Sequence, residues 1–497
     1  MILNRRLPRD FLNNLVRNLA MILIVALSMA LVTALCTNTE CLNYVIHDEW
    51  EKCNVEDGSF ETYVPLSKRN MLDLADLDVT IEKMFYTDVP VNDVSVLRFF
   101  VNRKKIDLAF VEQGRTPQSD NELFMEKLYA KNHGLSVGDT FYVGSYPFVI
   151  CGIGCIPDYG YVKQNTSDVA QNDEFSVALV TSGAFNAVKG TNKVVYNYAY
   201  KLGENCTAKD LKKKLVKLDF DPNSVKDTYI RGLIAEADTV NKEFNAFTDA
   251  VRYGSESLAR GIHAVGRAYA AYDGERATKE LYSGAMSLSN AAILFKEQFG
   301  AYLAESTKVE FVNLSGFAEA RYSIRINDPL NDSKLGKQAG LVVGVILLML
   351  LTYMLAIFAG GTIEKERAII GTLYALGYSK KEILSHYMKI PLAITLIGSF
   401  IGLFGGFALV DFLAASYAAM YSFPELVRVY PFYVEAYAVG MPLALAYCIN
   451  RHVLKKKLDE TPLQMMHEKV TGIGRMNFEL HGMSFSAKYR IRQFCRE

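Results

Sequence analysis

The chain has 497 residues, of which 50% are hydrophobic and 22% are charged, and its formal net charge is zero. These averages describe an ordinary soluble protein, and the balanced charge gives no support to nucleic-acid binding. The distribution along the chain is different, because several long stretches are almost free of charge.

Four apolar stretches predict membrane helices, at residues 19–37, 338–363, 390–415 and 429–450. Runs of this length can cross roughly 30 Å of hydrocarbon at about 1.5 Å per residue. The fourth stretch has the weakest pattern because it contains Glu435. A cleaved signal peptide is the alternative for the first stretch, but that stretch is long for a signal core and Leu35 is too bulky for the usual cleavage site. We therefore expect an uncleaved anchor.

Lys and Arg residues flank the apolar stretches in a consistent way. They occur in residues 1–18, in the loop of residues 364–389 and in residues 451–497. If basic loops stay in the cytoplasm, both ends and this loop are cytoplasmic, and residues 38–337 and 416–428 are outside a plasma membrane. The basic tail is expected to lie against anionic membrane lipids.

Residues 38–234 predict an external mixed α/β domain. Thr140–Gly154 favours a hairpin that turns near Gly144, the runs FSVALVTSG and KVVYNYAYKL are typical of strands, and NELFMEKLYAKNHGL has the spacing of a helix. Cys151 and Cys155 have no second ligand pair nearby, so we interpret them as small buried residues, and we expect no metal site.

Residues 235–337 predict a long antiparallel helical hairpin, followed by a linker from Asn327 to Gln338. Apolar residues recur at three-and-four spacing in two runs, which indicates one buried stripe on each helix, with a turn at Asp273 and Gly274. The hairpin is either a structural stalk or an arm that contacts a partner, and the pattern does not distinguish the two. The stripes are Phe244, Phe247, Val251, Leu258, Ile262 and Val265 in the first run and Leu281, Ala285, Leu288, Ala292, Phe295 and Phe299 in the second.

The loop of residues 364–389 predicts a helix, a glycine break and a second helix. Ile369, Leu373 and Leu376 lie on one face of the first helix, and Gly377 is suited to end it. Ser379 and Glu382 have the spacing of a capping box that starts the next helix. The apolar face either packs back on the membrane helices or docks on a partner, and periodicity leaves both open.

The same loop resembles the cytoplasmic coupling region of FtsX/MacB-like permeases of ABC transporters. The pattern is carried by Glu366, Arg367, Ile370, Gly371, Thr372, Leu373, Ala375, Leu376, Gly377, Ser379, Glu382 and Ile383. The order of one helix, a large external domain and three helices is similar to the family topology, and the stretch from Gly114 to Tyr161 is similar to its external core domain.

This resemblance implies a bacterial permease subunit that transmits motion from a separate ABC ATP-binding subunit to the external domain. Its contacts with the ATPase would be made by Glu366, Arg367, Ile370, Gly371, Leu373, Leu376, Gly377, Ser379 and Glu382. The resemblance also implies a second permease copy or a sister permease, and export of a lipid-linked, peptide or hydrophobic substrate or control of an extracytoplasmic enzyme. Ile369 stands where many members have Glu, and the larger members continue beyond the equivalent of Glu497, which leaves open a half-permease or a shortened chain.

Five glycines in the membrane stretches indicate close helix packing, either within one bundle or at a subunit interface. They are Gly340, Gly344, Gly398, Gly402 and Gly406.

Enzymatic functions have little support in the sequence. It contains no G-x-x-x-x-G-K-[ST] and no G-x-S-x-G, and the start of an H-E-x-x-H pattern at His467 ends with Thr471. We therefore expect no catalytic residues and no cofactor. The alternative to a permease is a membrane-anchored ligand-binding or sensory protein that works without an ATPase.

Overall fold

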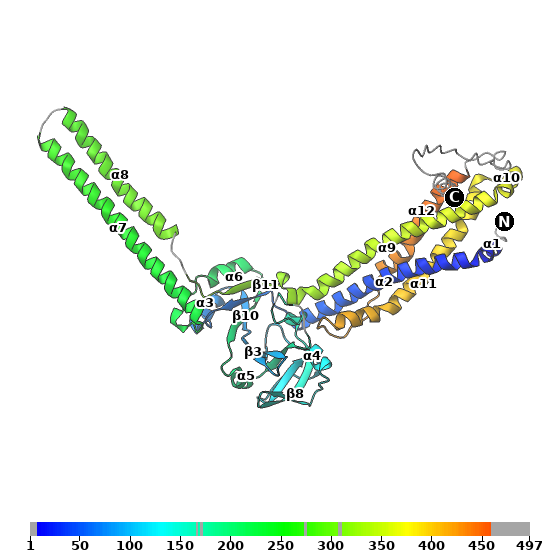
Figure 1. Ribbon diagram of the computed structural model, residues 1–497, viewed down its shortest axis with the longest axis horizontal. Helices are drawn as coiled ribbons and strands as arrows, with labels where there is room; N and C mark the ends of the chain where they lie inside the picture. Colours follow the sequence, from blue (N-terminus) through cyan, green and yellow to red (C-terminus); the bar gives the residue numbers. More distant parts are fainter. Residues whose placement is uncertain (1–6, 166, 169–171, 273–275, 307–310, 459–497) are drawn as a thin grey trace, which may run out of the picture. The chain divides into compact units, whose positions relative to one another are not determined.

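The computed structural model describes residues 7–458 except 166, 169–171, 273–275 and 307–310. The chain divides into two units, which are described separately (Figure 1). The membrane unit comprises Met1–Glu40, Leu335–Leu413 and Val429–Glu497, and the sheet unit comprises Cys41–Lys334 and Ala414–Arg428. The predicted basic tail of residues 459–497 lies outside the described residues.

Four helices in the described part are long and apolar enough to cross a membrane: α2 (Leu15–Lys52), α9 (Ile324–Lys365), α11 (Lys380–Ala418) and α12 (Phe432–Lys457). This confirms a membrane protein with one N-terminal and three C-terminal helices. A short helix α1 (Leu7–Asn13) precedes α2, and α10 (Arg367–Ala375) lies between α9 and α11. Buried side chains of α2, α9 and α12, including Val25, Met29 and Val434, form one apolar cluster of the membrane unit.

A mixed sheet of eleven strands forms the core of the sheet unit, in the order β11-β1-β10-β3-β4-β9-β6-β8-β5, with β2 paired to β10 and β7 to β8. The β4–β9 and β6–β8 pairs are parallel and the other pairs are antiparallel. This confirms the predicted α/β class. The strands are β1 (Gly58–Thr62), β2 (Val79–Lys83), β3 (Tyr86–Pro90), β4 (Val96–Val101), β5 (Phe110–Gly114), β6 (Glu122–Glu126), β7 (Thr140–Val143), β8 (Tyr146–Cys155), β9 (Phe175–Val180), β10 (Val194–Leu202) and β11 (Gly316–Glu319).

Four short helices accompany the sheet: α3 (Lys68–Ala75), α4 (Lys127–Asn132), α5 (Ser182–Lys189) and α6 (Ala208–Leu215). The largest apolar cluster packs β4, β6, β8 and β9 against α4 and α5, with Phe99, Leu123, Phe148 and Tyr129 fully buried. The β7–β8 hairpin turns at Gly144, whose φ of 59° is natural only for glycine, as the sequence indicated. Cys151 and Cys155 are buried in β8 with free thiols.

The predicted helix over NELFMEKLYAKNHGL is wrong in its first half. Residues Glu122–Glu126 form strand β6, and only Lys127–Asn132 is helical. Leu123, Phe124 and Met125 are all fully buried because both faces of β6 are covered: Leu123 and Met125 pack in one apolar cluster and Phe124 packs in another. A continuous apolar run of this kind fits a buried strand as well as a helix.

The predicted linker from Asn327 to Gln338 is also wrong, because α9 already begins at Ile324. The chain first returns to the sheet as β11, which pairs with β1. The Asn327 amide then donates to the carbonyls of Ala320 and Ser323 at the start of the helix, and Ile326 and Leu330 are buried. These contacts stabilise the helical conformation of a polar stretch for which periodicity alone predicts a linker.

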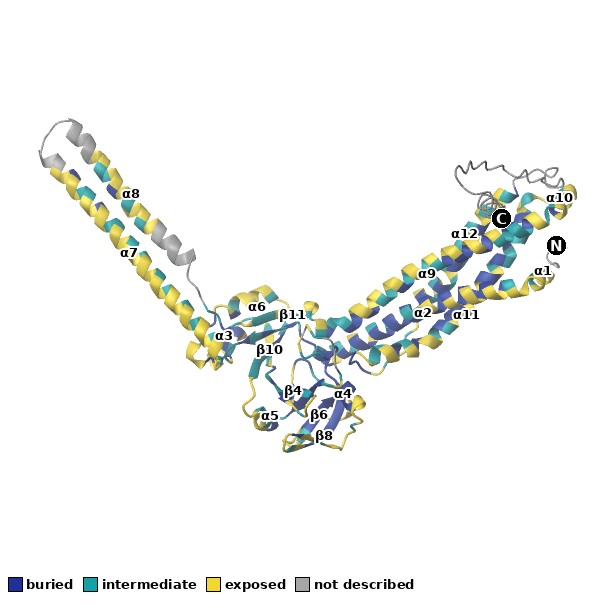
Figure 2. Cartoon of the chain, in the orientation of Figure 1, coloured by how far each residue is buried: buried dark blue, intermediate teal, exposed yellow. Residues whose placement is uncertain are grey.

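The predicted hairpin is formed by α7 (Thr228–Tyr272) and α8 (Arg276–Ser306), and its turn at residues 273–275 lies outside the described residues. The buried side of the hairpin agrees with the predicted stripes only in part, since Phe244, Val251, Ile262, Ala285 and Ala292 are half-buried. Ala259 and Ser289 are buried between the helices, whereas Phe247, Leu258, Val265, Leu288 and Phe295 are more than half exposed. Figure 2 shows how much of both helices is exposed. The environments of Leu281 and Phe299 lie outside the described residues.

Candidate functional site

The segment of residues 364–389 has the predicted helix, break and helix. Helix α9 ends at Lys365, Glu366 leaves helical geometry with φ −99° and ψ 16°, and α10 follows at once. Gly377, with φ 89°, ends α10 in a left-handed conformation. The amide of Tyr378 donates to the carbonyl of Leu373 at 3.1 Å and the amide of Gly377 to that of Tyr374 at 3.0 Å, which is the Schellman pattern that glycine permits.

Helix α11 starts at the predicted capping box. The Ser379 amide donates to the Glu382 carboxylate at 2.8 Å, and the Glu382 amide donates to the Ser379 hydroxyl oxygen at 3.4 Å. Tyr378 and Ile383, on either side of the box, both pack into the adjoining apolar cluster. The turn between α10 and α11 is therefore fixed by local contacts at both helix ends.

An apolar cluster holds one side of α10 within the membrane unit. Ile370 is fully buried, Gly371 is buried, and Leu373 and Tyr374 pack at the edge of the cluster. Helix α12 contributes to the same cluster near its end. The fully buried or nearly buried members are Ile363, Ile370, Ile383, Leu384, Met388, Leu454 and Leu458.

A hydrogen bond and two ion pairs lie beside the cluster. The Tyr387 hydroxyl donates to the Glu366 carboxylate at 2.6 Å, which ties the break before α10 to α11. Lys457 of α12 lies 2.9 Å from Glu364 at the end of α9, and Arg367 lies 3.2 Å from the same carboxylate group. These contacts place Glu366 and Arg367 in intramolecular interactions.

The other side of α10 is open. Leu376 is 76% exposed and Ile369 is 41% exposed, seven residues apart on one side of the helix. Ile369, Leu373 and Leu376 lie on one side of the helix, as their spacing requires, and Leu373 stands at the edge of that side where it meets the cluster. Gly377 and Ser379 are exposed beside Leu376. The predicted loop residues thus separate into a supporting side, with Ile370 and Gly371, and an exposed side around Leu376.

The five membrane glycines pack against α2 within the membrane unit. A Cβ atom at Gly340 or Gly344 of α9 would meet Leu35 or Val32. A Cβ atom at Gly398, Gly402 or Gly406 of α11 would meet Val25, Met29 or Thr33 respectively. Helix α2 is therefore contacted closely by both α9 and α11, in agreement with packing inside one bundle.

Within the sheet unit, the residues that follow α11 are attached to the β6–α4 junction, a contact that sequence patterns did not predict. The Ser422 hydroxyl donates to the Glu126 carboxylate at 2.6 Å, and the Ser422 amide donates to the Gly160 carbonyl at 2.8 Å. The Lys127 ammonium donates to the Phe423 carbonyl and lies 2.8 Å from Glu112. We call this set of contacts the 422–126 junction.

Glu126 is a buried acceptor for several donors at once. It caps α4 by accepting from the amides of Leu128 at 2.8 Å and Tyr129 at 3.1 Å, in addition to the Ser422 hydroxyl. Burial raises the pKa of the Glu126 carboxyl, and these hydrogen bonds oppose that rise. The carboxylate thus connects a sheet strand, a helix and the segment after α11.

Tyr421 extends the junction to the first turns of α9. Its hydroxyl donates to the Asp332 carboxylate, and its ring lies edge-on to Tyr161 at 4.9 Å. Both tyrosines belong to an apolar cluster with Leu42 and Ile46 of α2 and Leu330 of α9. The ends of three membrane-type helices are therefore packed together in the sheet unit.

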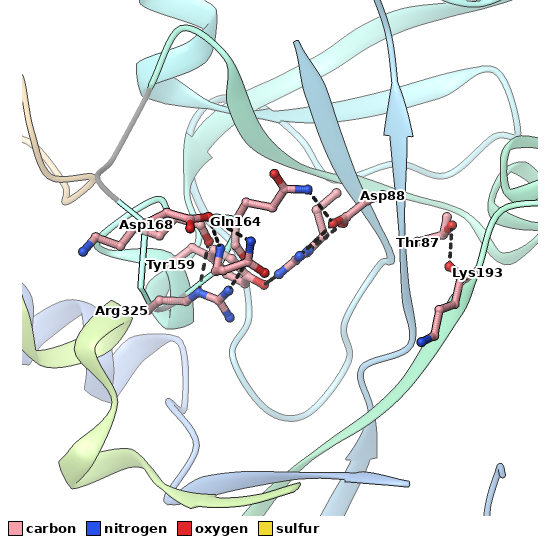
Figure 3. Close-up of polar contacts among 10 residues, drawn as sticks. Thr87, Asp88, Tyr159, Gln164, Asp168, Lys193 and Arg325 are labelled. Atoms are coloured by element: carbon pink, nitrogen blue, oxygen red, sulfur yellow. Dashed lines mark hydrogen bonds and ion pairs between the residues drawn. The ribbon is translucent and has the colours of Figure 1, made fainter. Parts of the chain in front are cut away.

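An arginine network lies next to this region (Figure 3). Arg98 of β4 contacts Asp88 of β3 through two nitrogens, at 2.7 and 2.8 Å, and donates to the Tyr159 hydroxyl at 2.9 Å. Arg325, in the first turn of α9, donates to the carbonyls of Lys163 and Gln164 at 3.1 and 2.6 Å. The Gln164 amide then donates to Asp88 at 3.1 Å. The network joins the start of α9 to the central strands.

A cavity of about 210 Å³ adjoins the network, lined by Glu56, Glu61, Asp158, Tyr159, Arg325 and neighbouring residues. The Glu56 amide donates to Asp107 at 2.9 Å, and Arg103 pairs with Asp158 through both carboxylate oxygens. Burial raises the pKa of both the Glu56 and the Asp107 carboxyls. The negative charge of Asp107 adds to the rise at Glu56, and the negative charge of Asp158 adds to the rise at Asp107. Among the described residues, no group of three His, Cys, Asp or Glu side chains is arranged to hold a metal ion.

Comparison with protein families gives a match in the C-terminal part of the chain. Residues 341–449 match the model of the FtsX-like permease C-terminal domain. The match begins within α9, includes all of α10 and α11, and ends within α12. No curated protein matches the chain.

The matched region therefore contains the α10 segment, its supporting cluster except Leu454 and Leu458, all of α11, and parts of α9 and α12. The topology of four apolar helices and a large mixed sheet agrees with this assignment. Residues 341–449 therefore form an FtsX-like permease C-terminal domain, which indicates a membrane protein of the ABC transporter permease type.

Proposed function

We propose that the protein is a permease subunit that couples ATP hydrolysis by a separate ATPase to movement of the sheet unit. The observation that carries the proposal is α10, which is held on one side by the apolar cluster around Ile370 and exposes Leu376 and Ile369 on the other. A helix that presents apolar side chains from a fixed support suits docking into a groove on a partner. The sequence itself contains no phosphate-binding loop for ATP.

The orientation follows from the positions of the basic residues. Residues 1–18, 364–389 and 451–497 face the cytoplasm, and the sheet unit and the hairpin are outside a bacterial plasma membrane. The ATPase therefore meets α10 from the cytoplasm. The supporting argument is the concentration of Lys and Arg in these segments, including Lys455, Lys456 and Lys457 after the last membrane helix.

Movement passes along two long helices. Helix α9 has 42 residues and α11 has 39, so each is roughly 60 Å long at about 1.5 Å per residue. Each is a single helix from the α10 segment to residues that belong to the sheet unit. A displacement of α10 tilts both helices, since Tyr387 and Ile383 of α11 contact Glu366 and the α10 cluster.

At the other end the motion enters the sheet unit through the 422–126 junction and through Arg325. Both attachments are made of directional hydrogen bonds, buried at Ser422 and half-buried at Arg325, which resist sliding more than apolar contacts do. The work done outside is export of a lipid-linked, peptide or hydrophobic substrate, or control of an extracytoplasmic enzyme.

The second candidate is a membrane-anchored ligand-binding or sensory protein without an ATPase. The cavity beside Arg325 favours it, because polar and aromatic side chains line a space of about 210 Å³ in the sheet unit. The two functions differ in whether an ATPase binds α10.

The test is affinity purification of the full chain from native membranes in mild detergent, with mass spectrometry and ATPase assay of the eluate. Leu376→Glu changes the exposed side of α10, and Leu72→Glu is the matched control, because Leu72 is 70% exposed on α3. We expect an ATP-binding subunit to co-purify with the wild type and with Leu72→Glu and to be lost with Leu376→Glu. If folded, abundant wild-type protein brings no ATPase, or if Leu376→Glu retains it fully, the coupling proposal is wrong.

A further inference from the structure

The hairpin of α7 and α8 is closed by small and polar residues. Ser289 of α8 donates its hydroxyl to the Ala259 carbonyl at 3.0 Å, and both residues are buried. Lys296 and Glu256 form an ion pair at 3.4 Å between the same two helices. The two helices therefore meet without using most of their large apolar side chains.

Those large side chains form an exposed stripe along α7. Val240, Phe247, Leu258 and Val265 are each about half exposed, and a groove runs past Leu258 and Val265 to Ala285 of α8. The stripe repeats every seven residues in two interleaved sets. The sets are Ala237, Phe244, Val251, Leu258 and Val265, the first three of which are half-buried, and Val240, Phe247, Gly254 and Gly261, which are exposed.

Two glycines of the stripe have no function in the hairpin itself. A Cβ atom at Gly254 or Gly261 would meet no heavy atom within 4 Å, so neither glycine is required for the contact with α8. Glycine in the middle of a helix costs about 1 kcal/mol relative to alanine. A glycine layer between Leu258 and Val265 allows the backbone of a further helix to approach closely.

We propose that this stripe, the α7 seam, pairs in parallel with the α7 seam of a second copy of the chain. The two interleaved sets have the spacing of the core positions of a parallel coiled coil. The helices are parallel because every copy has the same proposed orientation in the membrane, so this inference rests on that part of the proposed function. It does not depend on whether an ATPase binds.

The charges beside the seam fit a second copy. In a parallel coiled coil, the residue just before each first-set residue lies opposite a residue of the second copy whose number is higher by five. Glu236 then faces Asn241 and Glu243 faces Thr248, so no acidic side chain faces another one. The remaining charged residues between positions 236 and 260 lie away from the seam: Asp238, Lys242, Asp249, Arg252, Glu256 and Arg260. A strongly charged partner would find few complementary charges along this seam.

The test is cysteine cross-linking of the full chain in native membranes with a short bis-methanethiosulfonate reagent. Leu258→Cys and Gly261→Cys place thiols in the seam, and Arg260→Cys, which is exposed on α7 away from it, is the matched control. We expect covalent dimers with both seam variants, at least about tenfold above Arg260→Cys and above the wild type with its own eight cysteines. Equal cross-linking at Arg260, no dimer at either seam position, or a product containing a different protein would overturn the inference.

ATPase co-purification is measured on the same membranes, which separates this inference from the proposed function. Dimers at the seam without an ATPase support the α7 seam and contradict the coupling proposal. An ATPase without seam dimers supports the coupling proposal and contradicts the α7 seam.

Discussion

The two ends of α11 are held by opposite kinds of contact. Its first turns join the apolar cluster with Ile370 and Leu454, whereas the residues after its last turn are attached by the hydrogen bonds of Ser422 and the carbonyl of Phe423. Apolar packing is non-directional and tolerates small shifts, while buried hydrogen bonds fix one geometry. In the proposed function, the movement is therefore received at the end of α11 that tolerates small shifts, beside α10, and is passed on at the end with fixed geometry, beside Ser422.

The largest expected effect comes from placing a charge in the apolar end. Ile370→Glu buries a carboxylate without a partner and should lower the free energy of unfolding by about 4 kcal/mol. Ile369→Glu, one residue away but 41% exposed, should change it by less than about 0.5 kcal/mol. Denaturant unfolding in detergent measures both. Similar losses for the two variants would mean that α10 is not held as described.

The polar end should be almost as sensitive. Glu126→Ala leaves the amides of Leu128 and Tyr129 and the Ser422 hydroxyl without an acceptor, and should cost about 3 kcal/mol. Ser422→Ala removes one of these donors and should cost about 1 kcal/mol. A double-mutant cycle should give a coupling of about 1 kcal/mol. Strict additivity would show that Ser422 and Glu126 do not interact.

The turn that starts α11 contributes less. Ser379→Ala removes the hydroxyl oxygen that accepts from the Glu382 amide, and should reduce the free energy of unfolding by about 1 kcal/mol. Ser379→Asp retains an acceptor at the same place and should restore most of the loss. If the aspartate variant is as unstable as the alanine variant, the cap is not what stabilises this turn.

The smallest expected effect is a dependence of stability on pH in the sheet unit. The pKa values of Glu56 and Asp107 are raised by burial and by a neighbouring carboxylate, Asp107 for Glu56 and Asp158 for Asp107, so the folded state binds a proton more tightly than the unfolded state does. The stabilisation of the folded state by these two protonated carboxyls is complete below the ordinary carboxyl pKa range, and it is lost as pH rises through their raised pKa values. Thermal midpoints between about pH 5 and pH 9 should fall with rising pH, and Asp107→Asn should flatten that fall. An unchanged slope in Asp107→Asn would assign the pH dependence to other groups.

Most of the α10 segment could be predicted because its geometry is local. The positive φ of Gly377 and the hydrogen bonds of Ser379 and Glu382 involve residues a few positions apart, so spacing is sufficient to find them. Which side of α10 is buried could not be predicted. Periodicity places Ile369, Leu373 and Leu376 on one side, but the buried side is decided by Leu454 and Leu458, which come from α12.

The hairpin shows a similar division. The sequence indicated two long helices with apolar stripes, but several large side chains of these stripes, such as Phe247 and Leu258, are exposed, and small residues such as Ala259 and Ser289 are buried at the contact. Amphipathic spacing identifies an apolar side of a helix without identifying the partner that covers it.

By itself the sequence determined the four membrane helices, the mixed α/β class, the hairpin and the turn at Gly377, because each depends on hydrophobicity, periodicity or contacts between near neighbours. Only the tertiary structure decided that β6 is a strand, that α9 starts at Ile324 and that Ser422 meets Glu126. The physical reason is that these features depend on burial and hydrogen bonding between distant segments. Ser422 and Glu126 are 296 residues apart, and no local pattern records which distant donor a buried carboxylate will meet.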